Sequence, residues 1–131
     1  MRIEKFRLLP AASALLIAIA CTFGAMAQDA RAPLPSRVIM RGDVPDLQIV
    51  DLRGQRKNDM LIVQAELYNL APRDIQIYHR FRWLDENGFQ IGDGEVWKPT
   101  VILGRQSLML RGGAVSPKAA DFRLEMSLVM Q

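Results

Sequence analysis

The feature that most constrains the fold of this 131-residue chain is a two-residue alternation along three of its segments. The segments are residues 60–70, 74–83 and 122–128. Successive side chains of a β-strand point to opposite faces of a sheet, so the alternation predicts strands with one buried and one solvated face. The predicted inward rows are Leu61, Val63, Ala65 and Leu67; Ile75, Ile77, His79, Phe81 and Trp83; and Phe122, Leu124, Met126 and Leu128.

Shorter strand candidates and turn signals fill the rest of the chain after residue 37. The candidates are residues 38–40, 47–52, 89–91 with 96–97, and 107–111. Turn-forming residues separate the strands at 53–59, 69–74, 85–88, 102–106 and 112–121. No segment shows helical spacing with caps, apart from a single turn at 117–120. About seven short strands broken by turns predict an all-β domain, a β-sandwich, over residues 37–131.

Residues 1–27 have the organisation of a bacterial secretory signal peptide. A basic start is followed by an apolar run at residues 8–20, and a small-x-small cleavage site ends at Ala27. The apolar run is shorter than the roughly 20 residues that a membrane-spanning helix needs. The sequence therefore predicts export, with the mature chain starting at Gln28 in the periplasm and a flexible tether over residues 28–36.

Cys21, the only cysteine, supports a second interpretation of the same segment. Residues 18–21 read Ala-Ile-Ala-Cys and resemble a lipobox, although leucine is usual where Ala18 stands. Lipidation at Cys21 would anchor the protein to the outer membrane, whereas cleavage after Ala27 would release it. Both interpretations place the domain outside the inner membrane, and a membrane is a predicted partner only if Cys21 is lipidated.

The charge of the predicted mature chain gives no indication of a nucleic-acid partner. From Gln28 onward there are 14 Lys and Arg against 13 Asp and Glu, a net charge of +1. Proteins that bind nucleic acid through their charge carry a strong basic excess. We therefore expect no nucleic-acid partner.

The segment from Trp83 to Trp97 contains acidic residues and glycines, and three interpretations were compared for it. A calcium loop would need ligands at regular positions from Asp85 and a closing glutamate, but Phe89 and Val96 stand at two of those positions. A glycosidase-like pair of Asp93 and Glu95 would need a cleft to raise one pKa. The preferred interpretation is a β-hairpin with a polar tip, closed by Gly88.

Other residues with chemical potential are few. His79 lies in the middle of a predicted strand, and its preferred interpretation is a partly buried histidine with one hydrogen bond. Ser107 and Asp121 formally complete a triad with it, but no nucleophile elbow supports that triad. One histidine and one cysteine make a zinc site improbable. We therefore expect no catalytic residue, no metal and no cofactor, and hence no enzyme.

Tyr78, Arg80 and Arg82 form an outward row on the predicted strand 74–83 and are the candidate interaction surface. Arginine and tyrosine are enriched in interface hot spots, and arginine matches carboxylates and phosphates. The ligands considered are a partner protein, a lipid head group and the acidic peptides of peptidoglycan. The preferred interpretation of the row is nevertheless a solvated face whose arginines pair with Glu66 or Glu125 of neighbouring strands, and an interaction surface is the alternative.

Several motifs together resemble the YcfL family of bacterial envelope proteins. They are the segment 75–91 with its aromatic-x-Trp-x-Asp motif and the glycine turn after it, Trp97, and the segment 103–126 with its Phe-Arg-Leu strand. The resemblance covers roughly residues 38–130. His79 departs from it, because an aromatic residue is common at that position, and Cys21 departs through its weak lipobox.

The resemblance implies an immunoglobulin-like β-sandwich of about seven strands in a small lipoprotein of Gram-negative bacteria, without an established activity. Some members are encoded beside an activator lipoprotein of a penicillin-binding protein. The sequence and the resemblance together predict an exported, non-enzymatic envelope protein with a binding or structural role. The partner expected is an envelope protein or a ligand associated with peptidoglycan. The alternative is an outer-membrane lipoprotein accessory to peptidoglycan synthesis.

Overall fold

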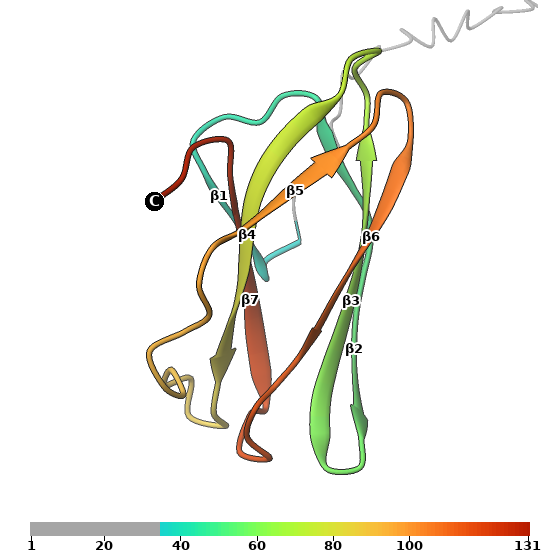
Figure 1. Cartoon of the computed structure of the whole chain (residues 1–131). Helices are drawn as coiled ribbons and strands as arrows, with labels where there is room; N and C mark the ends of the chain where they lie inside the picture. Colours follow the sequence, from blue (N-terminus) through green and yellow to red (C-terminus); the bar gives the residue numbers. More distant parts are fainter. Residues whose placement is uncertain (1–34) are drawn as a thin grey trace, which may run out of the picture. The chain divides into compact units, whose positions relative to one another are not determined.

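The computed structural model of the protein describes residues 35–131, which form two β-sheets (Figure 1). The predicted signal peptide, Cys21, Ala27 and most of the predicted tether lie outside the described residues. The seven strands are β1 (Val38–Arg41), β2 (Leu47–Lys57), β3 (Met60–Asn69), β4 (Ile75–Leu84), β5 (Lys98–Ile102), β6 (Ser107–Gly113) and β7 (Asp121–Ser127).

The strands form a four-stranded sheet in the order β1-β7-β4-β5 and a three-stranded sheet in the order β2-β3-β6. Neighbouring strands are antiparallel, except that β1 runs parallel to β7. The predicted all-β, immunoglobulin-like sandwich of about seven strands is confirmed. The order of its strands differs from that of an immunoglobulin constant domain. There the first, second, fifth and fourth strands form one sheet, whereas here the first strand shares a sheet with the seventh, fourth and fifth.

The core lies between the two sheets and uses the inward rows predicted from the alternation. Leu67 of β3, Ile77 of β4 and Leu124 of β7 are fully buried. Trp83 is also buried, and its ring stacks on Phe81 with a centroid distance of 5.5 Å. Leu128 is an exception: β7 ends at Ser127, and Leu128 is exposed.

The loop between β4 and β5 differs from the predicted hairpin. Residues 89–91 and 96–97 do not form strands, and a single bridge between Leu84 and Gln90 is the only pairing there. The strand that returns beside β4 after this loop is β5, which the sequence analysis does not predict. Pro99 argues against a strand in the sequence, because proline cannot donate a hydrogen bond to a neighbouring strand. It is tolerated here because β5 lies at the edge of its sheet.

The hairpin between β2 and β3 is tighter than the predicted turn at residues 53–59. β2 extends to Lys57, and only Asn58 and Asp59 connect the strands. Both residues have positive φ angles, of 50° and 61°. Two left-handed residues form the type I′ turn that matches the twist of a hairpin, and Asn and Asp tolerate that conformation best among non-glycine residues.

A candidate anion-binding surface around Glu125

The candidate surface lies on the outer face of the four-stranded sheet, where the predicted row Tyr78, Arg80 and Arg82 points away from the core. The register of β4 with β7 places Arg80 opposite Glu125 and Arg82 opposite Arg123. Cross-strand partners lie on the same face of a sheet, so the arginines of β4 stand beside the side chains of β7. The structure therefore supports the predicted orientation of the row.

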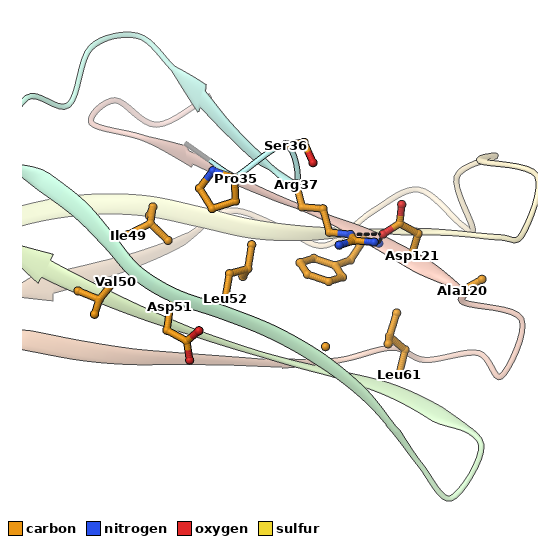
Figure 2. A pocket seen from close by; sticks show the side chains of 12 residues that line it. Pro35, Ser36, Arg37, Ile49, Val50, Asp51, Leu52, Leu61, Ala120 and Asp121 are labelled. Atoms are coloured by element: carbon orange, nitrogen blue, oxygen red, sulfur yellow. Dashed lines mark hydrogen bonds and ion pairs between the residues drawn. The ribbon is translucent and has the colours of Figure 1, made fainter. Parts of the chain in front are cut away.

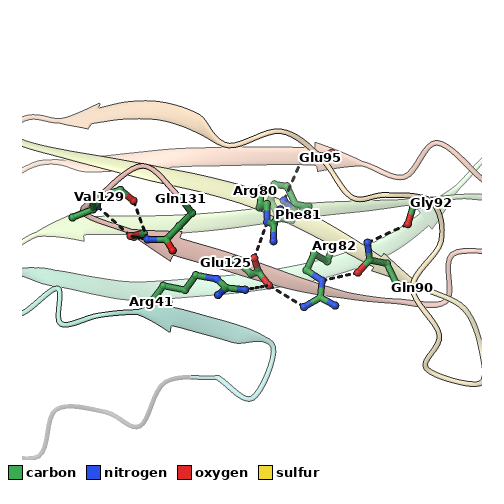
Figure 3. A network of polar contacts seen from close by, with 11 residues as sticks. Arg41, Arg80, Phe81, Arg82, Gln90, Gly92, Glu95, Glu125, Val129 and Gln131 are labelled. Atoms are coloured by element: carbon green, nitrogen blue, oxygen red, sulfur yellow. Dashed lines mark hydrogen bonds and ion pairs between the residues drawn. The ribbon is translucent and has the colours of Figure 1, made fainter.

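Glu125 is the centre of this surface and is fully buried, although the alternation predicts a solvated position for it. Arg80 donates from Nε to Oε2 at 2.7 Å, and Arg82 donates from Nη1 to Oε1 at 3.0 Å. Arg41, from β1, donates from Nη2 to the same Oε1 at 3.3 Å (Figure 3). Three guanidinium groups from two strands thus enclose one carboxylate, which explains why its side chain has no solvent exposure.

The electrostatics of Glu125 follow from this enclosure. Burial raises the pKa of a carboxyl group, because it disfavours the charged form. The hydrogen bonds from Arg80, Arg82 and Arg41 outweigh that effect and hold the pKa of Glu125 below its ordinary value. Glu125 is therefore ionised at neutral pH, and the group of three arginines and one glutamate carries a net charge of +2.

Trp97 completes the site, and it was not among the predicted residues. The guanidinium carbon of Arg80 lies 4.7 Å from the centroid of the Trp97 ring, and that of Arg41 lies 5.9 Å from it. A cation over an aromatic face is attracted by the ring and held in a defined orientation. Arg82 is oriented differently, by a hydrogen bond from its Nε to Oε1 of Gln90 at 3.0 Å.

A second charged group continues the surface along β7. Asp121 accepts hydrogen bonds from Nε of Arg37 at 2.6 Å and from Nη1 of Arg123 at 2.8 Å. Partial burial opposes ionisation of Asp121, but the bonds from Arg123, Arg37 and the N–H of Phe122 lower its pKa to about 2. With the Glu125 group, this makes five arginines and two carboxylates, a net charge of +3.

A pocket of about 370 Å³ opens next to the Asp121 group, at the edge of the sandwich (Figure 2). It is lined by residues 35–37 before β1, by β2 and Leu61 of β3, and by residues 120–122 at the start of β7. Ile49, Leu52 and Phe122 contribute apolar surface, and Arg37 and Asp121 contribute an ion pair. The sequence does not predict this pocket, because its walls come from two different sheets. A pattern within one segment does not show how far apart two sheets lie.

His79 has the environment predicted for it. The residue is buried, and its Nδ1 lies 2.9 Å from the hydroxyl oxygen of Thr100 on β5. Burial lowers the pKa of His79, Lys98 lowers it further, and Glu95 partly opposes both effects. The imidazole is thus held neutral at pH 7 with one side-chain hydrogen bond.

The formal triad of Ser107, His79 and Asp121 is not assembled. Ser107 belongs to β6 of the opposite sheet, where it pairs with Tyr68. Asp121 pairs with Leu84, five residues along β4 from His79, a separation of roughly 16 Å at 3.3 Å per residue. The three side chains therefore cannot form a charge-relay arrangement.

The acidic residues of the Trp83–Trp97 segment have structural partners. Oδ1 of Asp85 accepts the backbone N–H groups of Asn87 and Phe89, both at 2.9 Å, which closes the turn. Glu95 accepts the N–H of Phe81 and the indole N–H of Trp83, both at 3.3 Å. Glu95 thereby covers the edge of β4 beyond the end of β5. Within residues 35–131, no cluster of three or more His, Cys, Asp or Glu side chains is arranged to hold a metal ion.

A family model described as a protein of unknown function, DUF1425, matches residues 41–128. The chain belongs to this family. No curated protein matches the sequence.

Two solved structures are similar to this DUF1425 protein. Cj0090 of Campylobacter jejuni has 25% sequence identity and a TM-score of 0.63, and the match covers 71% of this chain and 98% of that one. A DUF1425 family member from Shewanella sp. pv-4 has 19% identity and a TM-score of 0.59, with 65% and 80% of the chains covered. At these identities the similarity supports the β-sandwich fold and carries no activity across. The part of the DUF1425 chain that the structure describes contains no helix of the length and hydrophobicity needed to cross a membrane.

Proposed function

We propose that this protein is an exported, non-enzymatic binding protein of the bacterial cell envelope, and that it recognises its ligand with the outer face of the β1-β7-β4-β5 sheet. One observation carries the proposal: Arg41, Arg80 and Arg82 converge on the buried Glu125. Burying a charge is costly unless it is paired, and a solvated sheet face needs no such arrangement. The network gathers three partly exposed guanidinium groups around one carboxylate on this face.

The absence of catalysis is part of this proposal. A catalytic acid, base or nucleophile needs a partner within hydrogen-bond reach and access to substrate. His79 is buried with Thr100 as its partner, and Glu95 is committed to the edge of β4. A solvated face whose arginines pair with Glu125 is the preferred interpretation from the sequence, and the structure contains that pairing. The pairing is compatible with a binding surface, because the network retains an excess of positive charge.

The location of the protein remains a proposal that rests on residues 1–27 and on the resemblance to the YcfL family. The periplasm follows from cleavage after Ala27. An outer-membrane lipoprotein accessory to peptidoglycan synthesis follows from lipidation at Cys21. The mass of the exported protein, together with fractionation of the envelope, distinguishes them, because a lipid-modified Cys21 and a free Gln28 terminus differ in both properties. A Cys21→Ser variant that stays in the outer-membrane fraction would contradict the lipoprotein alternative.

A photo-crosslinking experiment in living cells tests the proposed surface. The change Tyr78→p-benzoylphenylalanine places a crosslinker on the candidate face, and the same change at Tyr68 places one on the outer face of the opposite sheet. We expect a discrete adduct from position 78 alone. It should disappear with Arg41→Ala and persist with Arg53→Ala, which removes an equal charge from β2.

Two results would contradict the proposed surface. One is the absence of any adduct from position 78 in cells that produce and export the protein normally. The other is an identical set of adducts from positions 68 and 78, because collisions without a defined site label both faces alike.

A further inference from the structure

We infer that the outer face of the four-stranded sheet binds the phosphate group of a lipid head group. This inference rests on the proposed function, because it names the ligand class of the same surface. It follows from three observations: the convergence of the arginines, their unused donors, and a row of apolar side chains beside them.

The arginines converge, and this favours a compact anion. The donating nitrogens of Arg41, Arg80 and Arg82 each lie within 3.3 Å of one oxygen of the Glu125 carboxylate. An extended acidic peptide would instead present carboxylates about 6.6 Å apart, because alternate residues share a face. Glu125 occupies the point of convergence. A ligand would therefore meet the donors that Glu125 leaves free on three clustered guanidinium groups, and arginine forks suit phosphate as well as carboxylate.

The three arginines keep N–H donors that form no hydrogen bond with the described residues, and their charge exceeds that of Glu125. Three guanidinium groups carry fifteen N–H donors, and bonds to Glu125 and Gln90 use four of them, which leaves eleven. Their side chains are 42%, 23% and 31% exposed for Arg41, Arg80 and Arg82. The other carboxylate of the face, Asp121, is paired with Arg37 and Arg123. Among residues 35–131, the three arginines and Glu125 thus keep unbonded N–H donors and a net charge of +2. A phosphate group supplies the matching acceptors and negative charge.

A row of apolar side chains borders the arginines and favours a lipid as the source of the phosphate. Pro99 and Val101 of β5 pair with Tyr78 and Gln76 of β4, so they point to the same outer face as the arginines. Val101 is 53% exposed. Aromatic residues such as tryptophan are enriched where apolar and polar phases of a bilayer meet. A free phosphate ion gains nothing from contact with these apolar side chains, whereas the acyl chains attached to a lipid head group can bury them.

Vesicle binding tests the inference with the exported form of the full chain. A Cys21→Ser background excludes a contribution from an attached lipid. We expect sedimentation with vesicles of phosphatidylcholine and phosphatidylglycerol, and none with phosphatidylcholine alone. Arg41→Ala should lower the partition coefficient about fivefold, since one basic side chain near an anionic surface contributes about 1 kcal/mol. Arg53→Ala, the charge-matched control on β2, should change it much less.

Competition experiments separate the sources of the anion. Inorganic phosphate should compete only weakly, because it lacks the apolar part of the ligand, and Val101→Ser should weaken vesicle binding without changing the effect of phosphate. Equal losses in Arg41→Ala and Arg53→Ala would overturn the inference in favour of unspecific charge attraction. Displacement by polyglutamate together with a crosslinked acidic protein at position 78 would also overturn it, while the proposed binding function would stand. If position 78 gives no adduct and vesicles do not bind, both proposals fail.

Discussion

Replacing Glu125 by glutamine tests whether the buried carboxylate holds the arginine cluster together. Glutamine has nearly the same shape, so the substitution removes the charge without opening a cavity. At an effective dielectric constant of about 20, each arginine at about 4 Å attracts the carboxylate by roughly 4 kcal/mol. Much of this attraction is offset by the desolvation of Glu125, which is fully buried. The net effect is therefore smaller than the gross attraction.

The expected loss can be bounded from the burial of the partners. Removing one partner of a buried ion pair costs about 3–5 kcal/mol. The guanidinium groups around Glu125 reach solvent, which screens their mutual repulsion once the carboxylate is gone. We therefore expect Glu125→Gln to lower the free energy of unfolding by about 2–3 kcal/mol. For a domain of this size, that corresponds to a decrease in Tm of roughly 10–20 °C.

Urea and thermal unfolding of the two proteins at pH 7 measure the loss, and Glu66→Gln is the matched control. Glu66 lies on β3 of the other sheet, so its substitution removes the same charge outside the cluster. A change below about 0.5 kcal/mol in Glu125→Gln, or one equal to that in Glu66→Gln, would refute the reasoning. The pKa of Glu125 is lowered, so its contribution is complete above the pKa in the unfolded chain and is lost as the pH falls. The difference between wild type and Glu125→Gln should accordingly shrink below about pH 4.5.

Three further substitutions test the core and the acid response. Trp83→Ala should cost about 3–5 kcal/mol in urea unfolding, because the ring is buried between the sheets, and a cost below 1 kcal/mol would contradict the assigned face. Gly112→Ala should cost about 1–3 kcal/mol, since its Cβ would lie 2.5 Å from the Phe81 ring, whereas Gly113→Ala, with no atom within 4 Å, should be nearly neutral; equal costs would count against this packing. Asp121 has a pKa of about 2 in the folded protein against 3.8 in the unfolded chain, so its contribution of about 1 kcal/mol is present above pH 3.8 and lost toward pH 2. Acid titrations of Asp121→Asn should lack this part of the pH dependence, and an unchanged titration would rule it out.

The sequence by itself determined the all-β class, the three longest alternating strands and the faces of their side chains. The alternation predicted β3, β4 and β7 to within one residue and identified their buried rows, because side-chain direction in a strand depends only on position along that strand. The orientation of Arg80 and Arg82 followed from the same rule. Membership of the DUF1425 family is also carried by the sequence, since the family model matches residues 41–128.

Only the tertiary structure decided which side chains meet on the outer face. Glu125 occupies a position that the alternation makes solvated, and it is buried because Arg41 and the two arginines of β4 come from strands on either side of β7. Trp97 contacts Arg80 only because the loop after β4 returns to the same face. The pairing of β1 and β4 with β7 brings Arg41, Arg80 and Arg82 to Glu125 across 84, 45 and 43 positions of the sequence. Periodicity within a strand carries no information about its neighbours, and the charge of this site arises from those neighbours.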